Sequence, residues 1–423
     1  MLPIVKANSA EMETLFAAIG QRARQDAAEV RAEVRTHLDG IFGRGVEAVN
    51  ELSLERDGAL PREIPRAELD AALSESDPVL LENLRRAARN IEDYQTKLLP
   101  QGGQWTNPDG GTVGFAIRPA ERAGLYIPGG TSAYPSTVLM TAIPARAAGV
   151  KEVILCTPPG GQLKPEVLAA AAVAGVGRVF SLNGVAAVAS MALGLGMIPR
   201  CDVVAGPGNA FVTEAKRQLF GFCGIDSTAG PSDILVLADG SANPVWVAAD
   251  LLSQAEHGAR SGAVLVTTGE ALAQAVCAEI TRQIAALPRR AEAEAALRSY
   301  GAAVVASSKE EALAVVNRVA PEHLEILAEN PERWLDGVQN AGAVFLGRYS
   351  PEALGDYWAG PSHVLPTEGG SRYFSAVSVE TFLKRVSVIQ YSKDAFLPVK
   401  ESIARLARAE GLEGHARSAE VRE

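Results

Sequence analysis

Three short apolar runs decide the fold class: EVILCT at residues 152–157, RVFSL at 178–182 and DVVAG at 202–206. Each run precedes a segment of helical character. These segments are an Ala-rich stretch from about residue 164, a second helix after the second run, and AFVTEAKRQLF at 210–220. Strands that alternate with helices in this way pair in parallel through right-handed crossovers. The stretch therefore predicts an α/β fold.

The same alternation restarts further along the chain. Four more buried-strand candidates are each followed by a helical segment: DILVLAD (233–239), AVLVTT (263–268), AAVVAS (302–307) and GAVFLG (342–347). Two successive arrays of this kind predict two doubly wound subdomains, with junctions near residues 125 and 233.

Helical segments flank the two arrays. Residues 1–21 are expected to form a short helical arm, and 22–100 are rich in Ala, Glu and Arg at helical spacing. A passage rich in Gly and Pro at 101–111 then ends the helical pattern. From about residue 378 the only strand signal is VSVIQY, so a separate helical tail is expected there.

Composition and charge exclude several classes of protein. The 423 residues carry a formal net charge of −10, which argues against a nucleic-acid partner, and no basic run suits an anionic membrane. The N-terminus lacks a continuous apolar segment, so no signal peptide is expected. The four cysteines form no CxxC pair, which argues against a disulfide framework and a thiolate zinc site. We expect a cytoplasmic protein.

The five histidines are the most informative residues. His37 lies among charged residues and reads as a solvated helix position. Asn243 is expected to cap a helix near whose end Gln254 and His257 are i,i+3 neighbours that can point at one ion. Considered alone, His257 more commonly satisfies the last carbonyls of its helix.

Two further polar residues complete a possible metal-binding set. Asp356 alone reads as a turn-forming residue, and His415 alone as a surface histidine near the C-terminus. If both converge with Gln254 and His257, they supply two imidazoles, one carboxylate and one amide. Such a mixed nitrogen and oxygen set suits Zn²⁺, for which Mn²⁺ or Co²⁺ can substitute.

Glu322 and His323 form a candidate acid–base pair. They follow Pro321, which is expected to open a helix, and they offer a carboxylate to polarise water and an imidazole to move protons. The competing interpretation is a dipole-stabilising Glu beside a capping His, and the residues alone slightly favour it.

Two Gly-rich turns, at 126–137 and 204–211, follow apolar runs and can present backbone N–H groups to a phosphate. Neither turn matches GxGxxG, and glycines of tight turns are the commoner explanation.

Seven segments together resemble successive signatures of the histidinol dehydrogenase family, in the family's order and spacing. They are GLYIPGGTSAYPSTVLMTAIPARAAGV (124–150), AGPGNAFVTEAKRQLFG (205–221), DSTAGPSDILVLAD (226–239), DLLSQAEHG (250–258), VAPEHLEI (319–326), GDYWAGPSHVLPT (355–367) and AEGLEGHARS (409–418). The resemblance covers the chain from about residue 100 and is looser before it. Taken together, the seven segments favour the functional interpretation of the candidate residues over the structural one that each residue suggests when it is considered alone.

The resemblance implies two incomplete Rossmann-like subdomains and a zinc-dependent, four-electron oxidation. Residues 22–125 and 234–377 would form the first subdomain and 126–233 the second, between an N-terminal arm (1–21) and a C-terminal tail (378–423). L-histidinol would be oxidised through L-histidinal to L-histidine with two NAD⁺, as in the last steps of histidine biosynthesis.

The family's site residues fall on specific positions of this chain. One zinc ion per subunit would be held by Gln254, His257, Asp356 and His415, where it orients the substrate. His323 would remove the alcohol proton, and Glu322 would activate the water that hydrates the aldehyde. Substrate would contact these ligands and His323, together with Thr131, Ser232, Glu352, His363 and Glu410. The nucleotide would contact Tyr126 and Asn209.

The resemblance also implies a homodimer in which the C-terminal tail of one subunit completes the partner's site. His415 and Glu410 would then act in trans. A tail that carries a possible ligand without an obvious core of its own fits that expectation.

Two departures from the family pattern bear on the substrate and the nucleotide. Ala186 stands where the family usually has a Gln that contacts the nucleotide, and Ser362 replaces the more usual Asn before His363. Loss of one amide hydrogen bond costs about 1 kcal/mol. The alternative is a paralogous zinc- and NAD-dependent dehydrogenase of another small alcohol. A non-catalytic metal- or ligand-binding protein is the third hypothesis, and the intact Glu322–His323 pair argues against it.

Overall fold

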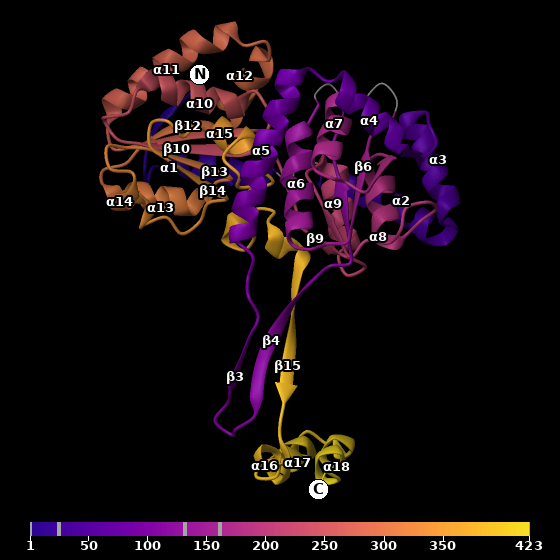
Figure 1. Ribbon diagram of the computed structural model, residues 1–423. Helices are drawn as coiled ribbons and strands as arrows, with labels where there is room; N and C mark the ends of the chain where they lie inside the picture. The colour runs from indigo at the N-terminus through magenta and orange to yellow at the C-terminus, as the bar shows by residue number, and fades with distance from the viewer. Residues whose placement is uncertain (1, 23–26, 130–132, 160–162, 423) are drawn as a thin grey trace.

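The computed structural model describes residues 2–22, 27–129, 133–159 and 163–422. Its centre is two six-stranded sheets, each in its own lobe, from which a three-stranded ribbon projects (Figure 1). The predicted α/β class is confirmed, because all neighbouring strands of the two large sheets pair in parallel except for one edge pair.

The first sheet belongs to the lobe that carries the site. Its strands, in spatial order, are β1 (Ile4–Lys6), β12 (Gly301–Val305), β11 (Gly262–Thr267), β10 (Asp233–Ala238), β13 (His323–Leu327) and β14 (Ala343–Leu346). Its helices are α1 (Ala10–Gln21), α10 (Pro244–Ala255), α11 (Glu270–Gln283), α12 (Arg290–Tyr300), α13 (Lys309–Val319), α14 (Glu332–Leu335) and α15 (Glu352–Tyr357). All six residues of β10 are buried, as expected for a parallel strand covered on both faces.

The second sheet lies in the other lobe. Its strands, in order, are β2 (Arg62–Ile64), β7 (Arg178–Ser181), β6 (Glu152–Thr157), β5 (Arg122–Tyr126), β8 (Val203–Ala205) and β9 (Gly224–Ile225), with β2 antiparallel to β7. Its helices are α2 (Ala27–Arg44), α3 (Val46–Asp57), α4 (Arg66–Glu75), α5 (Pro78–Lys97), α6 (Pro135–Ala147), α7 (Pro165–Val173), α8 (Gly184–Leu193) and α9 (Ala210–Leu219).

The N-terminal segments pack differently from the expected domain grouping. Residues 22–125 were expected to share a subdomain with 234–377, yet Leu38 and Ile91 pack into the two cores of the second sheet, and β2 and β5 are strands of that sheet. The arm at 1–21 is an integral part of the first lobe, because β1 pairs with β12. The spacing of apolar residues shows which face of a helix is buried, but it does not show which of the two sheets the helix covers. Helical spacing alone therefore cannot assign residues 22–100 to a subdomain.

A second difference concerns the residues after Pro321, which were expected to open a helix. They form strand β13, whose five residues are all buried. The sequence HLEIL pairs with β10 on one side and β14 on the other, and this pairing overrides a weak local helix-start signal.

The C-terminal segment forms the projecting ribbon and its end. Strand β4 (Thr112–Pro119) pairs antiparallel with β15 (Leu383–Gln390) and with β3 (Gly103–Thr106), so the predicted strand at VSVIQY is confirmed. Helices α16 (Lys393–Phe396), α17 (Lys400–Ala409) and α18 (Glu413–Glu420) gather at the end of the ribbon, away from both lobes (Figure 1). Among the described residues, no helix combines the length and the apolar character needed to span a bilayer.

Candidate active site

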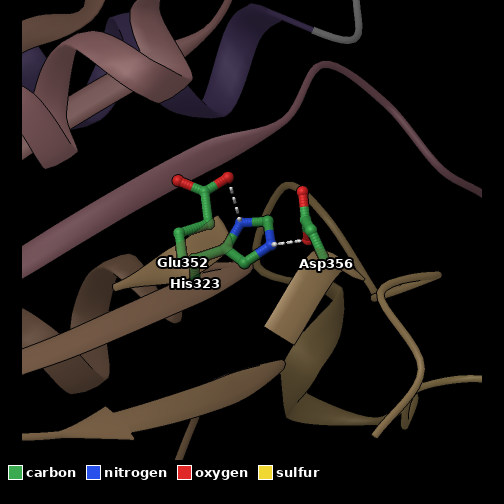
Figure 2. Close-up of side chains that lie close together, drawn as sticks. All are labelled: His323, Glu352 and Asp356. Carbon is green, nitrogen blue, oxygen red and sulfur yellow. Dashed lines mark ion pairs between the residues drawn. The ribbon is translucent and has the colours of Figure 1, made fainter. Parts of the chain in front are cut away.

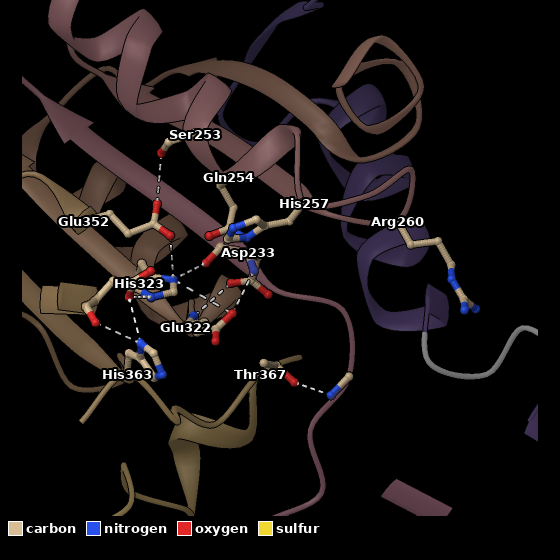
Figure 3. A network of polar contacts seen from close by, with 12 residues as sticks. Asp233, Ser253, Gln254, His257, Arg260, Glu322, His323, Glu352, His363 and Thr367 are labelled. Carbon is tan, nitrogen blue, oxygen red and sulfur yellow. Dashed lines mark hydrogen bonds and ion pairs between the residues drawn. The ribbon is translucent and has the colours of Figure 1, made fainter. Parts of the chain in front are cut away.

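The candidate site begins at the amino ends of two central strands of the first sheet. Asp233 is the first residue of β10 and His323 the first of β13, where His323 lies opposite Ile234 in the register. Strand β10 continues as a buried apolar run, and β13 does so apart from Glu325, so Asp233 and His323 lie together where the two strands start (Figure 3). The more usual position for a site in a parallel sheet is the carboxyl end of the strands.

Asp233 and Glu322 bond each other reciprocally. The backbone N–H of Glu322 donates to Asp233 Oδ1 at 2.8 Å, and the backbone N–H of Asp233 donates to Glu322 Oε2 at 3.0 Å. Burial, and then the nearby Asp233 charge, raise the pKa of Glu322 well above its usual value. The neighbouring Ser232 side chain acts in the opposite direction and lowers the pKa of Glu322.

The hydrogen bonds of His323 decide its tautomer. Its Nδ1 lies 3.2 Å from the carbonyl oxygen of Asp233, which can only accept, so Nδ1 carries the proton. Burial lowers the pKa of His323 to about 4, and the ring is therefore neutral near pH 7. Its Nε2 is buried without a hydrogen-bond partner among the described residues and lies 3.8 Å from Asp356 Oδ1. An unprotonated nitrogen thus faces the interior of the site.

Two carboxyl groups of α15 flank the His323 ring (Figure 2). Glu352 Oε1 lies 3.7 Å from His323 Nδ1, and Ser253 Oγ donates to Glu352 Oε2 at 3.2 Å. Burial raises the pKa of Glu352 to about 8 and that of Asp356 to about 6. Burial disfavours the charged form of both groups, and clustered acids with raised pKa values are typical of functional sites.

Gln254 and His257 reach the same cluster from the end of α10 (Figure 3). Asn243 caps this helix as predicted, by accepting from the backbone N–H of Val245. Gln254 is fully buried, and its amide nitrogen lies 2.9 Å from His257 Nδ1, while His257 is exposed. The amide oxygen of Gln254 has no hydrogen-bond partner within the described ranges.

These donors fit a divalent metal ion. His323, Glu352 and Asp356 each offer a ligand atom, and the three atoms lie within 4.8 Å of one another. The unpartnered amide oxygen of Gln254 and the buried acids supply lone pairs and negative charge that a cation would satisfy. Mixed imidazole, carboxylate and amide donors suit zinc.

His363 connects the site to the second lobe. Its Nδ1–H donates to the carbonyl oxygen of Asp356 at 3.1 Å, and its Nε2 accepts from Thr137 Oγ1 of α6 at 3.1 Å. Ser362 Oγ donates to the carbonyl oxygen of Met140 at 3.1 Å, also in α6. Ser362, which stands where an Asn is more usual, therefore forms a hydrogen bond between the two lobes.

The two predicted tail residues lie elsewhere in this chain. His415 is in α18 and Glu410 ends α17, and both are exposed at the far end of the ribbon (Figure 1). The described chain therefore does not bring them to its own cluster. Thr131 lies outside the described residues.

The predicted nucleotide contacts lie at the carboxyl ends of strands in the second sheet. Tyr126 ends β5, and its hydroxyl donates to Asn183 Oδ1 at 2.7 Å. Asn209 caps α9 by accepting from two backbone N–H groups, at 3.1 Å each. In the turn between β8 and α9, Gly206 has φ +122°, and a Cβ there would lie 2.1 Å from the Tyr126 carbonyl oxygen. The tight-turn interpretation therefore holds for this glycine.

Sequence reasoning missed Asp233, Glu325 and Thr137. Glu325 is fully buried and lies two residues after His323 on β13, so a strand assignment would have placed both on one face. Asp233 was visible as the first residue of DILVLAD. Thr137 had no signal, because its role depends on the contact between the lobes.

The chain is similar to known proteins over nearly its full length. The family model described as histidinol dehydrogenase matches residues 20–423. The histidinol dehydrogenase of Moorella thermoacetica is 51% identical over 402 residues, which cover 93% of this chain and 94% of that protein. The Bacillus subtilis enzyme is 46% identical, with 93% of each chain covered. The crystal structure of histidinol dehydrogenase from Elizabethkingia anophelis aligns with a TM-score of 0.89 at 33% identity, covering 100% of this chain and 98% of that one.

Proposed function

Because the chain belongs to the histidinol dehydrogenase family, we propose that its site oxidises L-histidinol through L-histidinal to L-histidine. Membership makes it an NAD-dependent oxidoreductase of histidine biosynthesis. The single observation that carries the proposal is the buried, unprotonated Nε2 of His323, which faces Asp356 of α15. Bound NAD⁺ would supply the hydride acceptor in each of the two oxidations.

His323 is the general base of the alcohol oxidation. Its Nε2 accepts the hydroxyl proton as the carbinol carbon loses a hydride, while its Nδ1–H stays on the Asp233 carbonyl. The neutral ring suits this step, since a protonated imidazole has no lone pair to offer.

Glu322 serves the second oxidation. Its ionised carboxylate takes a proton from the water that adds to the aldehyde, and the hydrate can then lose the second hydride to NAD⁺. The environment that raises its pKa makes Glu322 a stronger base once it is ionised.

Gln254, His257 and Asp356 of one subunit, together with His415 of the other, hold one zinc ion. A bound zinc ion would supply a Lewis acid that holds and orients the amino alcohol. The unpartnered amide oxygen of Gln254 supports this assignment. Mn²⁺ or Co²⁺ fits the same donors.

Substrate and nucleotide occupy the two sides of the contact between the lobes. Glu352 and Glu410 offer carboxyl oxygens to the amine and imidazole of histidinol, and Thr131, Ser232 and His363 are further substrate contacts. Tyr126 and Asn209 contact the nucleotide from the second sheet. The enzyme acts in the cytoplasm as a homodimer whose tails are exchanged, an arrangement that the remote position of His415 supports.

The test is NADH formation from L-histidinol by the zinc-loaded enzyme. His323→Asn should lower kcat by roughly 10²- to 10⁴-fold, the range contributed by a positioned general base. His37→Asn is the matched control, because His37 lies on α2 in contact with Glu33, outside the site. Full activity of His323→Asn would refute its role. Turnover of alcohols that lack the imidazole, with none of histidinol, would favour the paralogous dehydrogenase.

Exchange of the tails has its own test. A heterodimer of one His323→Asn subunit and one His415→Asn subunit, purified through two different tags, contains one intact site if His415 acts in trans. It should then show about half of the wild-type activity per dimer, since one of its two equivalent sites is rebuilt. If His415 acts in cis, both sites are defective and the heterodimer is inactive.

A further inference from the structure

Asp233 bonds both members of the proposed acid–base pair through three different groups. Its carbonyl oxygen accepts from Nδ1–H of His323, its backbone N–H donates to Glu322 Oε2, and its Oδ1 accepts from the backbone N–H of Glu322. These distances lie between 2.8 and 3.2 Å. A shift of the Asp233 backbone would therefore disturb both residues at once.

The remaining oxygen of Asp233 is held by a residue from the N-terminal segment. Nη2 of Arg22 donates to Asp233 Oδ2 at 2.7 Å, and the side chains of the two residues are 0% and 8% exposed. Arg22 Nη1 also donates to the carbonyl oxygen of Arg260 at 3.3 Å. The contact is close-fitting, because a Cβ at Gly262 would lie 2.7 Å from Arg22 Nη1. Arg22 thus ties α1 to the start of β10.

We infer that Asp233, anchored by Arg22, is a positioning residue that fixes the His323 tautomer and the Glu322 carboxyl group. The inference deepens the proposed function and rests on the assignment of His323 as the base. A neutral imidazole has two tautomers, and only the one protonated at Nδ1 leaves Nε2 free to accept a proton. Arg22 restrains the side chain of Asp233, and the side chain restrains the carbonyl group that selects this tautomer.

An alternative is that the Arg22–Asp233 ion pair only stabilises the fold. Buried pairs do so weakly in net terms, and loss of one partner leaves an uncompensated charge. A structural role alone would lower stability without changing which ring nitrogen of His323 carries its proton. The tautomer itself is therefore the discriminating measurement.

The experiment compares Arg22→Met, Arg22→Lys and Asp233→Asn with the wild-type, zinc-loaded enzyme. Nitrogen-15 NMR of labelled histidine reports the tautomer of each ring, and His323→Asn assigns the signal among the five histidines. In wild type, His323 should be protonated at Nδ1. In Arg22→Met and Asp233→Asn, a second population protonated at Nε2 should appear. Their kcat should fall by roughly 10²-fold, in the range of a misplaced general base, while KM for histidinol changes less than threefold.

Arg22→Lys keeps the positive charge and should restore most of kcat and the Nδ1–H signal. If Asp233→Asn does not fold, the comparison of Arg22→Met with Arg22→Lys still tests the positioning role. The matched control is Asp226→Asn, which breaks a different buried ion pair, Lys216 Nζ to Asp226 Oδ1 at 2.6 Å, in the second lobe. This control should lower the free energy of unfolding and leave the His323 tautomer unchanged.

The two hypotheses fail in different ways. An unchanged His323 tautomer and an unchanged kcat in both Arg22→Met and Asp233→Asn would overturn the positioning role, even if His323→Asn is inactive. A fully active His323→Asn would overturn the proposed base instead, whatever the NMR spectra of the Asp233 variant show.

Discussion

Glu325 caps the helix that carries two of the site's acids: its Oε1 accepts a hydrogen bond from the backbone N–H of Glu352 at 2.7 Å, across 27 residues of sequence. Pro351, which precedes α15, makes no side-chain cap of its own. Burial, and then the nearby carboxyl group of Asp250 on α10, raise the pKa of Glu325 well above its usual value. One buried carboxyl group on β13 therefore acts on both α15, which carries Asp356, and α10, which carries Gln254.

Two substitutions of Glu325 should distinguish its role as a hydrogen-bond acceptor for α15 from the effect of its charge. Glu325→Leu removes the acceptor and leaves a buried N–H unpaired, which should cost about 1–3 kcal/mol in the free energy of unfolding. Zinc content should fall as well, because α15 carries Asp356. Glu325→Gln retains an acceptor oxygen and should lose much less of both. Urea unfolding and metal analysis measure the two effects, and equal losses in the Leu and Gln variants would contradict the capping role.

The buried ion pair next to the turn between β8 and α9 should make a large contribution to the free energy of unfolding. Lys216 Nζ bonds Asp226 Oδ1 at 2.6 Å and the Gly206 carbonyl oxygen at 2.9 Å. Lys216→Met leaves Asp226 buried without its counter-charge and should cost about 3–5 kcal/mol in urea unfolding. Lys216→Met combined with Asp226→Leu should recover much of that loss.

The matched control for this prediction is an exposed pair. Lys97 and Asp93 are in contact at 2.6 Å, yet their side chains are 72% and 68% exposed. Lys97→Met should change the free energy of unfolding by less than about 1 kcal/mol. A similar loss in the buried and exposed variants would show that burial does not set the cost.

The free energy of unfolding of the metal-free protein should fall as the pH rises through the pKa values of Asp356 and Glu352. Burial raises the pKa of Asp356 to about 6 and that of Glu352 to about 8, both above their usual values. The folded state therefore holds more protons than the unfolded state, and the free energy of unfolding falls as pH rises toward about 8. Zinc binding should counteract this loss, because the cation favours the ionised carboxylate of Asp356.

Thermal unfolding of chelator-treated protein between pH 5.5 and 8.5 measures this dependence. Asp356→Asn should flatten the acidic half of the curve, and zinc should raise Tm more at pH 8 than at pH 5.5. A Tm of the metal-free protein that rises steadily with pH would contradict the pKa directions of both acids.

Placing a Gln at position 186, where the resemblance leads one to expect it, should destabilise this chain. Ala186 is 2% exposed within α8 and packs in a core that includes Val34 and Leu52. A longer side chain there overpacks the core and should cost about 1–3 kcal/mol in free energy of unfolding. Ala186→Gln should therefore lower Tm without lowering KM for NAD⁺. A lower KM with unchanged Tm would show that the missing amide limits nucleotide binding, and Ala187→Gln, one position along the same helix, controls for overpacking alone.

Much of the architecture was predictable because its signals are local. Each strand from EVILCT to GAVFLG reads as a short apolar run, and the strands lie where expected, although β14 is half-buried and not fully buried. The cap at Asn243 and the neighbouring Gln254 and His257 follow from helix periodicity. The strand at His323 was misread as a helix, since its identity comes from pairing with β10 and β14 on either side.

By itself the sequence determined the α/β class, and its resemblance to the family pointed to the pair Glu322–His323 and to most of the polar residues that meet in the cluster. Only the tertiary structure decided that this cluster lies at the amino ends of β10 and β13, that Asp233 and Arg22 join it, and that His415 lies far from it. The physical reason is range. Hydrophobic periodicity reports which face of an element is buried. The His323 tautomer and the Arg22–Asp233 ion pair instead arise from groups that are 90 and 211 residues apart in the chain.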